Sequence, residues 1–205
     1  MDATEQLSGF RVVPVVVIDD AELAVPLAQT LLDAGLAVIE ITLRTEQAMT
    51  AIRHVTEDVP AMLTGAGSIR NVDQLDNVFN AGAKFAVSPG STVALTDAAI
   101  ANNYPFVPGA TTPSEMLTLV ERGYRLQKFF PAEASGGIRL LKSVATPIPE
   151  AKFMPTGGIT AELAKDYLAL PNVAGVGGSW IVPAKLLQAR DFDSIARLAS
   201  AAVAL

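Results

Sequence analysis

Short apolar runs alternate with longer stretches of helical spacing along almost the whole chain. The apolar runs are rich in β-branched residues, which is typical of strands. The sequence predicts strands over residues 12–18, 38–43, 61–64, 85–88, 105–108, 126–130, 152–155 and 173–176. It predicts helices over residues 21–34, 46–57, 72–81, 94–102, 113–122 and 192–204.

This order of elements predicts the fold class. Strands that alternate with helices pair in parallel through right-handed crossovers. Eight strands favour a closed α/β barrel, the TIM (β/α)8 fold, whereas an open flavodoxin-like sheet needs only five or six. We therefore expect one domain over residues 1–205, with a short lead-in over about residues 1–10.

The segments that follow the predicted strands differ from those that precede them. TLRT, GAGS, SPG, PGATT, FFPAE, PTGG and GGSW come after strands and are rich in Gly, Pro, Ser and Thr. DAGL, NAGAK and ERGY come before strands and are typical of helix ends. Because barrel enzymes carry their active sites at the carboxyl ends of the strands, one functional rim is expected there.

Composition excludes several classes of partner. The net charge is −6 and no cluster of Lys and Arg occurs, so nucleic acid is not an expected partner. No apolar run approaches the roughly 18 residues of a membrane span, and residues 1–9 do not read as a signal peptide. We expect a cytoplasmic protein. Half of the residues are hydrophobic, and the surplus predicts a homo-oligomer.

The chain has no cysteine and a single histidine, His54. Thiol catalysis and Cys-ligated zinc are excluded, and a catalytic triad is not expected. His54 falls within a predicted helix and is interpreted as exposed rather than catalytic. Asp19 and Asp20 are interpreted as a helix cap, and no spacing of acidic residues predicts a metal site. The chemistry must come from Lys, Glu, Asp, Arg and hydroxyl groups.

Lys128 is the only one of six lysines that lies inside an apolar strand. Strand side chains alternate between faces, so Leu126, Lys128 and Phe130 share one face. If that face lines the barrel, partial removal from water favours the neutral amine that attacks a carbonyl. The alternatives are a surface lysine on a strand edge and a lysine in a buried ion pair.

Glu40 interrupts the apolar run VIEITL, where a charged group must be paired or neutralised. Glu40, Thr42 and Arg44 have the same parity and are expected to converge as an acid–base and anion-binding set. The alternative is a structural Glu40–Arg44 ion pair. An amine, a carboxylate and a guanidinium together suit Schiff-base aldol chemistry on a keto acid, whose carboxylate an arginine can bind bidentately.

Paired glycines follow strands seven and eight, in PTGGI and GVGGSW. In barrels these two loops often hold a phosphate with backbone N–H groups, and the Ser179 hydroxyl can add a donor. The alternative is that these glycines only mark turns. No role is assigned to Trp180.

Seven segments together resemble the 2-keto-3-deoxy-6-phosphogluconate (KDPG) aldolase family, which includes the 4-hydroxy-2-oxoglutarate (KHG) aldolases. In chain order they are VVPVVVI, EITLRT, GAGS, AVSPG, KFFPAEASGG, PTGGI and GGSWIVP, between residues 12 and 183. KFFPAE combined with EITLRT is specific, whereas any single segment is not.

The resemblance implies a class I aldolase that needs no cofactor, forms trimers and cleaves KDPG to pyruvate and glyceraldehyde 3-phosphate. Lys128 would form the Schiff base, Glu40 would act as general acid and base, and Arg44 would lie near the pyruvate carboxylate. The resemblance also assigns the rest of the site: Phe130, Pro89 and Thr156 to the wall of the pyruvate pocket, and Gly157, Gly158, Gly178 and Ser179 to the phosphate.

One residue departs from the family pattern. The family commonly has Thr in GAGT, where this chain has Ser68. Its hydroxyl can still donate to a carboxylate, and the missing methyl group is expected to loosen the pocket. Two other functions stay open: a related aldolase for KHG or for the galactonate epimer, and a non-catalytic barrel that binds phosphorylated metabolites.

Overall fold

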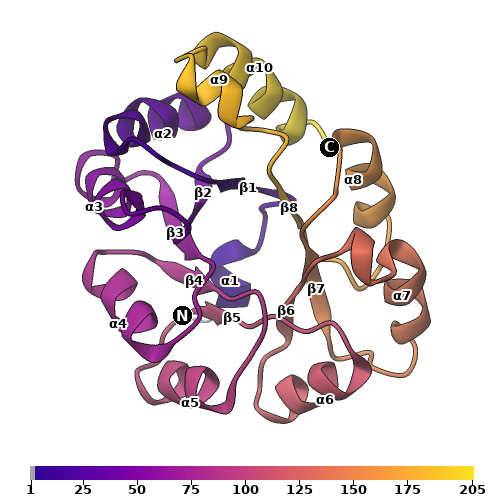
Figure 1. Ribbon diagram of the computed structural model, residues 1–205. Helices are drawn as coiled ribbons and strands as arrows, with labels where there is room; N and C mark the ends of the chain where they lie inside the picture. The colour runs from indigo at the N-terminus through magenta and orange to yellow at the C-terminus, as the bar shows by residue number, and fades with distance from the viewer. Residues whose placement is uncertain (1–2) are drawn as a thin grey trace.

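The computed structural model describes residues 3–205, whose strands form a ring surrounded by helices (Figure 1). The strands in this part of the chain are β1 (Val12–Val16), β2 (Val38–Thr42), β3 (Leu63–Gly67), β4 (Phe85–Val87), β5 (Phe106–Val107), β6 (Leu126–Phe129), β7 (Lys152–Pro155) and β8 (Val176–Gly178). The described strands therefore form the single α/β barrel domain expected from the sequence.

All strand pairs are parallel, and isolated bridges complete the ring. Six strands pair in the order β5-β4-β3-β2-β1-β8, and β6 pairs with β7. A bridge from Gly109 to Lys128 joins the end of β5 to β6. Bridges from Phe153 to Val173 and from Thr156 to Gly177 join β7 to β8. Neighbouring strands in the ring thus follow the order of the chain.

Helices cover the outside of the ring, and their ends carry the expected signals. The helices between strands are η1 (Ala21–Leu23), α2 (Ala24–Asp33), α3 (Ala48–Asp58), α4 (Val72–Asn80), α5 (Val93–Ala101), α6 (Pro113–Glu121), η2 (Glu133–Ser135), α7 (Gly137–Val144) and α8 (Ala161–Leu168); α9 (Ala184–Gln188) and α10 (Phe192–Val203) follow β8. Asp20 accepts a hydrogen bond from Glu22 N–H and caps η1, as predicted. Gly35, Gly82 and Gly123 have positive φ at helix ends. Among residues 3–205, no helix is long and apolar enough to cross a membrane.

Two predicted strands are misplaced by two or three residues. The third was expected over 61–64 and β3 spans Leu63–Gly67, and the eighth was expected over 173–176 and β8 spans Val176–Gly178. Both observed strands end in glycine-containing sequence that was interpreted as loop. The helices α7, α8 and α9 were not predicted.

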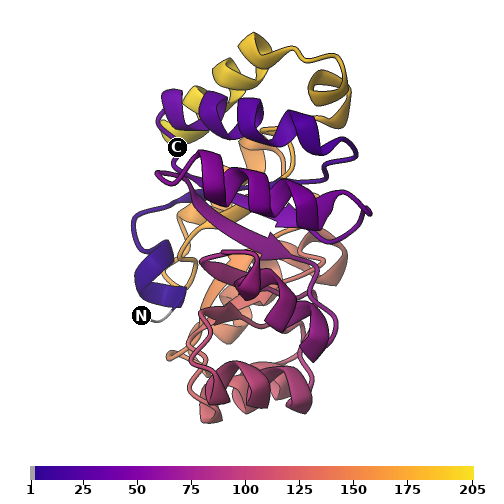
Figure 2. The same ribbon diagram turned by 90° about the vertical axis from the view of Figure 1, so that its left-hand side faces the viewer.

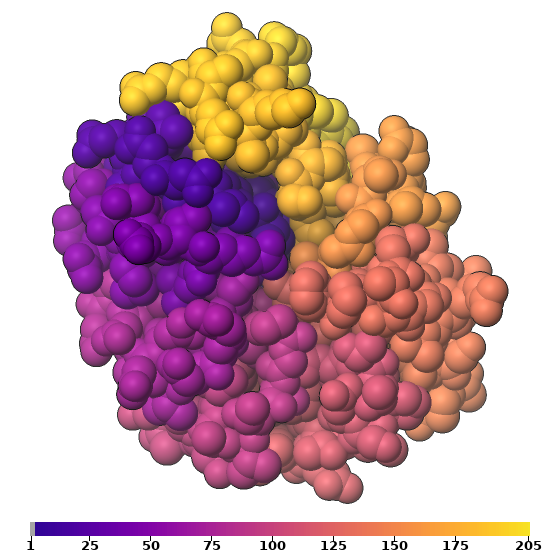
Figure 3. All heavy atoms as spheres, viewed as in Figure 1, coloured from indigo at the N-terminus to yellow at the C-terminus, as the bar shows by residue number. Residues whose placement is uncertain are grey.

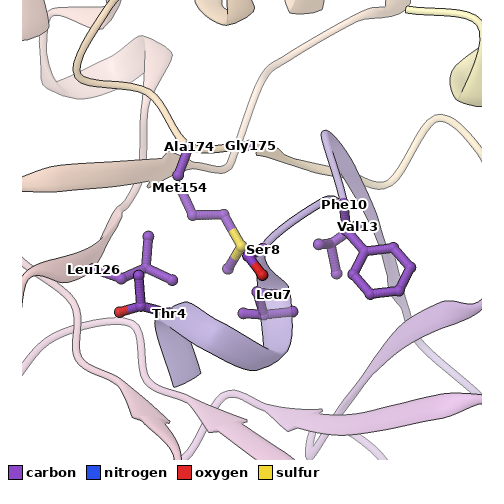
Figure 4. A pocket seen from close by; sticks show the side chains of 9 residues that line it. All are labelled: Thr4, Leu7, Ser8, Phe10, Val13, Leu126, Met154, Ala174 and Gly175. Atoms are coloured by element: carbon purple, nitrogen blue, oxygen red, sulfur yellow. The ribbon is translucent and has the colours of Figure 1, made fainter. Parts of the chain in front are cut away.

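The lead-in expected over about residues 1–10 contains a helix, α1 (Ala3–Leu7). Figure 2 shows α1 on the side of the barrel from which the strands start. A cavity of about 120 Å³ lies between α1 and the strand starts, and Met154 points toward Leu7 and Ser8 within it (Figure 4). Thus α1 covers the amino end of the barrel and leaves the carboxyl end as the open face.

Candidate active site

Lys128 and Glu40 meet inside the barrel, although 87 residues separate them in the chain. Lys128 Nζ donates a hydrogen bond to Glu40 Oε1 at 3.0 Å. The two side chains are 4% and 0% exposed, so the pair is almost removed from water. Removing two charges from water costs about as much free energy as their attraction returns, so a gain in stability does not by itself explain this pair.

The alternation of β6 explains why Lys128 points inward. Gln127 turns its side chain outward and donates to the carbonyl oxygens of Met116 and Tyr124. Phe129 packs outward against Phe153. Lys128 lies between them on the opposite face, with Nζ 5.7 Å from the centre of the Phe130 ring.

The second oxygen of the Glu40 carboxylate is buried and has no hydrogen-bond partner within residues 3–205. A buried carboxylate oxygen without a partner is costly, and such atoms call for a specific explanation. This oxygen can accept a hydrogen bond from a substrate hydroxyl or from water. The geometry therefore places an amine and a proton acceptor side by side.

Glycine in β3 makes room for Glu40. A Cβ at Gly67 would lie 2.0 Å from Glu40 Oε1, and one at Gly65 would lie 2.2 Å from the Phe85 ring. Any side chain at these positions would occupy the volume of the carboxylate or the ring. Sequence reasoning missed Gly67, although a glycine inside a strand often marks such a close approach.

Arg44 lies at the rim beside Ser68. Arg44 Nε donates to Ser68 Oγ at 3.1 Å, and Arg44 is exposed. Glu40 pairs with Lys128, so the structural Glu40–Arg44 ion pair considered as an alternative does not form. Thr42 was expected to join the anion-binding set, but its hydroxyl donates to the Val16 carbonyl oxygen at 2.9 Å. Thr42 thus connects β2 to β1.

Phe130 and Gly157 lie against each other just beyond the carboxyl ends of β6 and β7, and Lys128 Nζ lies 5.7 Å from the centre of the Phe130 ring. A Cβ at Gly157 would lie 3.3 Å from the Phe130 ring. The Thr156 side chain packs against β8. A Cβ at Gly177 of that strand would lie only 2.2 Å from Thr156 Oγ1. Gly177 is a further close-approach glycine that sequence reasoning missed.

Pro89 follows β4 and lies beside Gly109, which follows β5. A Cβ at Gly109 would lie 2.4 Å from the Pro89 carbonyl carbon. Ser88 is fully buried, and its hydroxyl accepts a hydrogen bond from Gly109 N–H at 3.3 Å. These contacts fix the Pro89 backbone against Gly109, which forms the bridge to Lys128.

The turn after β7 has a backbone conformation that can bind an anion through its N–H groups. Gly157 and Gly158 have φ of +104° and +78°, in the left-handed region that favours glycine. Gly158 is exposed and Gly157 is partly exposed. Consecutive backbone N–H groups of this kind can face one anion.

The loop after β8 completes this part of the rim. Ser179 is exposed, and a Cβ at Gly178 would lie 2.3 Å from the Trp180 ring. The sole tryptophan of the chain therefore packs directly on one of the glycines assigned to the phosphate. Figure 3 shows the open face on which these loops lie.

Other candidates lie apart from this set. His54 lies on α3 in the outer layer and is partly buried rather than exposed as predicted. Within the described part of the chain, no three His, Cys, Asp or Glu side chains gather in a way that could hold a metal ion.

The comparisons with known proteins all indicate the same family. The sequence model of the family KDPG and KHG aldolase matches residues 3–198. The 2-dehydro-3-deoxy-phosphogluconate aldolase of Dickeya dadantii is 48% identical over 202 residues, which are 98% of this chain and 95% of that protein.

Two solved structures match closely. KDPG aldolase from Legionella pneumophila, with pyruvate captured at low pH as a covalent carbinolamine intermediate, gives a TM-score of 0.96 at 41% identity and covers 98% of each chain. The aldolase of Zymomonas mobilis ZM4 with 3-phosphoglycerate gives a TM-score of 0.94 at 40% identity and covers 99% of this chain and 95% of that chain.

Proposed function

The chain belongs to the KDPG and KHG aldolase family, and we propose that it cleaves KDPG to pyruvate and glyceraldehyde 3-phosphate through an imine on Lys128. The observation that carries this proposal is the buried contact of 3.0 Å between Lys128 Nζ and Glu40 Oε1. The second Glu40 oxygen has no partner within residues 3–205 and supplies a proton acceptor beside the amine.

The reaction begins at the ketone. The Lys128 amine attacks C2 of the keto acid, and Glu40 moves protons as the carbinolamine loses water to form the imine. Glu40 then accepts the proton of the C4 hydroxyl, directly or through a water molecule. The C3–C4 bond then breaks and glyceraldehyde 3-phosphate leaves. The two electrons of that bond pass into the imine and form an enamine. Protonation at C3 and hydrolysis release pyruvate and regenerate the amine.

We assign the carboxylate of the substrate to Arg44 and Ser68. Arg44 donates through Nε to Ser68, which leaves its two terminal nitrogens for a carboxylate. Phe130, Pro89 and Thr156 provide the walls of the same pocket. This arrangement binds the pyruvate half of the substrate next to Lys128.

The phosphate is assigned to the turn at Gly157 and Gly158 and the loop at Gly178 and Ser179. The left-handed backbone of both Gly157 and Gly158 and the exposure of Gly158 support the first assignment. The Zymomonas mobilis aldolase was solved with 3-phosphoglycerate, which has a phosphate and a carboxylate. We therefore propose a phosphorylated substrate rather than 4-hydroxy-2-oxoglutarate.

A direct assay distinguishes the candidate substrates. The purified protein is incubated with KDPG, with its C4 epimer and with 4-hydroxy-2-oxoglutarate, and pyruvate release is measured with and without a chelator. The fastest turnover is expected on KDPG, unchanged by the chelator, and Lys128→Ala is expected to remove it. Faster turnover on either other compound would reassign the substrate and keep the chemistry.

We further propose a cytoplasmic homotrimer. The exposed apolar residues Val93 and Ile100 on α5 and Leu117 on α6 support a subunit interface on this side of the barrel. Light scattering behind a sizing column is expected to give three times the 21.4 kDa of one chain. A mass of one chain would contradict the trimer.

A further inference from the structure

The Tyr167 side chain connects α8 to the η2 turn on the open face of the barrel. The aldol steps described above do not use this side chain. Tyr167 lies on α8, is fully buried, and donates its hydroxyl to Glu133 Oε1. Glu133 begins η2, the turn that follows the Lys128 strand. Gly137 leaves room for the pair, since a Cβ there would lie 2.9 Å from Glu133 Oε1 and 3.1 Å from the Tyr167 hydroxyl oxygen.

The remainder of Glu133 lies against the glycine turn after β7. Glu133 N–H donates to the Gly157 carbonyl oxygen at 3.2 Å. A Cβ at Gly158 would lie 2.9 Å from Glu133 Cβ and 3.0 Å from Cγ. One residue thus contacts both glycines of the turn through its backbone and its side-chain stem, while Tyr167 holds its carboxylate.

We propose that Glu133 and Tyr167 are positioning residues for the phosphate of the substrate, acting by fixing the Gly157–Gly158 turn. This inference rests on the proposed function, because it takes the turn as the phosphate seat. Tyr167 anchors the pair inside the protein, and Glu133 transmits that anchorage to the exposed turn.

Two physical reasons make such a contact necessary. Glycine is the most flexible residue, and two consecutive glycines lose much conformational entropy when they are held in one backbone conformation. Backbone N–H groups bind phosphate oxygens well only within a narrow range of distance and angle. A turn that is not fixed from behind would bind the phosphate less tightly.

The charge of Glu133 gives a second role to Tyr167. If the Glu133 carboxylate turned toward the Gly157–Gly158 turn, it would repel a phosphate dianion bound there, because like charges a few ångströms apart repel each other strongly. The Tyr167 hydroxyl holds the carboxylate over Gly137. Burial first, and then the hydrogen bond to Glu133 and its charge, raise the pKa of Tyr167, so the hydroxyl stays protonated as the donor.

The test compares two aldehydes that differ only in the phosphate. Condensation of pyruvate with glyceraldehyde 3-phosphate and with glyceraldehyde is measured for the wild type and for Tyr167→Phe. The variant is expected to lose about 10-fold in kcat/KM with the phosphorylated aldehyde, mainly through KM, as for one hydrogen bond to a charged group. Its rate with glyceraldehyde and its imine formation with pyruvate should stay unchanged.

Two further variants separate positioning from general damage. Glu133→Gln keeps an acceptor for Tyr167 and should keep most of the preference for the phosphorylated aldehyde, whereas Glu133→Ala should lose it. Tyr124→Phe removes a hydroxyl that donates to the Thr96 carbonyl oxygen at 2.9 Å, and it serves as the matched control. The control should leave both rates unchanged.

Each contrary outcome has a distinct meaning. Equal losses on both aldehydes in Tyr167→Phe, or an unchanged preference, would overturn the positioning role while the aldolase chemistry stands. A wild type that forms the imine but does not distinguish the aldehydes would also overturn it. A wild type that forms no imine with pyruvate would instead refute the proposed function.

Discussion

The Glu40 carboxylate occupies the volume that a side chain at position 67 would fill, with Oε1 2.0 Å from the place of a Cβ on Gly67. Glu40 and Gly67 lie on neighbouring strands, where Glu40 pairs with Gly65 and Thr42 with Gly67. The position of the proposed proton acceptor therefore depends on the absence of a side chain on β3.

Gly67→Ala is expected to displace the carboxylate from Lys128 and to lower turnover more than it lowers the amount of folded protein. Gly65→Ala is the matched control, because its Cβ would meet the Phe85 ring rather than Glu40. Both variants should lose stability through crowding, by about 1–3 kcal/mol. Similar turnover per folded molecule in the two variants would contradict a specific role for Gly67.

Glu40→Gln is expected to lower kcat by about 10²–10⁴-fold, the range typical of general acid–base groups. The amide keeps the shape of the side chain but cannot accept and return a proton. Steady-state cleavage of KDPG measures the effect, with the exposed Glu57→Gln as the control for an unrelated loss of charge. A rate near that of the wild type would mean that water or another group carries the proton.

Ser68→Thr tests the residue that departs from the family pattern. Ser68 has a φ of +63°, and a β-branched residue is strained in this left-handed region. We expect a small loss of stability, measured by urea unfolding, because the branched Cβ of Thr fits this backbone region less well than the Cβ of Ser. We also expect narrower selectivity among aldehydes, because the added methyl group tightens the pocket. An unchanged selectivity profile would contradict the interpretation that Ser68 loosens it.

Glu115 gives the protein a component of stability that depends on pH. Burial tends to raise the pKa of Glu115, but hydrogen bonds from the Thr111 and Thr112 N–H groups and the Thr112 hydroxyl outweigh it, so the pKa is lowered. A carboxyl with a lowered folded-state pKa stabilises the protein above its unfolded pKa. That stability is lost as the pH falls through the folded pKa.

Glu115→Gln keeps an oxygen acceptor in the capping box but removes its charge, so it is expected to cost about 0.3–1 kcal/mol at neutral pH, as for a negative charge at a helix N-terminus. The difference from the wild type should shrink below about pH 4, where the carboxyl becomes protonated. Urea unfolding at both pH values checks this, with Glu121→Gln in the same helix as the control. A difference that is equal at both pH values would mean that the charge contributes nothing.

The barrel and the inward directions of Lys128 and Glu40 could be anticipated because each rests on a local pattern, whereas the hydrogen bond between the two side chains could not. Alternation of apolar runs with helices predicts the ring, and a charge inside an apolar strand predicts a side chain facing its lumen. Leu126 and Lys128 share the inner face as predicted, since Leu126 lines the cavity beneath the barrel.

Other features depend on contacts between distant segments. Gly67 and Gly177 were read as loop residues because glycine has low strand propensity, and only the facing Glu40 and Thr156 side chains explain them. The Glu133–Tyr167 contact joins residues 34 apart on different elements, which no periodicity reveals. The helix α1 is too short to give a clear periodic signal.

Sodium borohydride reduction in the presence of pyruvate, followed by peptide mass spectrometry, tests the central claim most directly. We predict a mass increase confined to the peptide that contains Lys128, absent without pyruvate and absent from Lys128→Ala. An adduct on another lysine would contradict the assignment of the nucleophile. Folded wild-type protein without any adduct would contradict the aldolase chemistry and favour a barrel in which Lys128 and Glu40 form a structural ion pair.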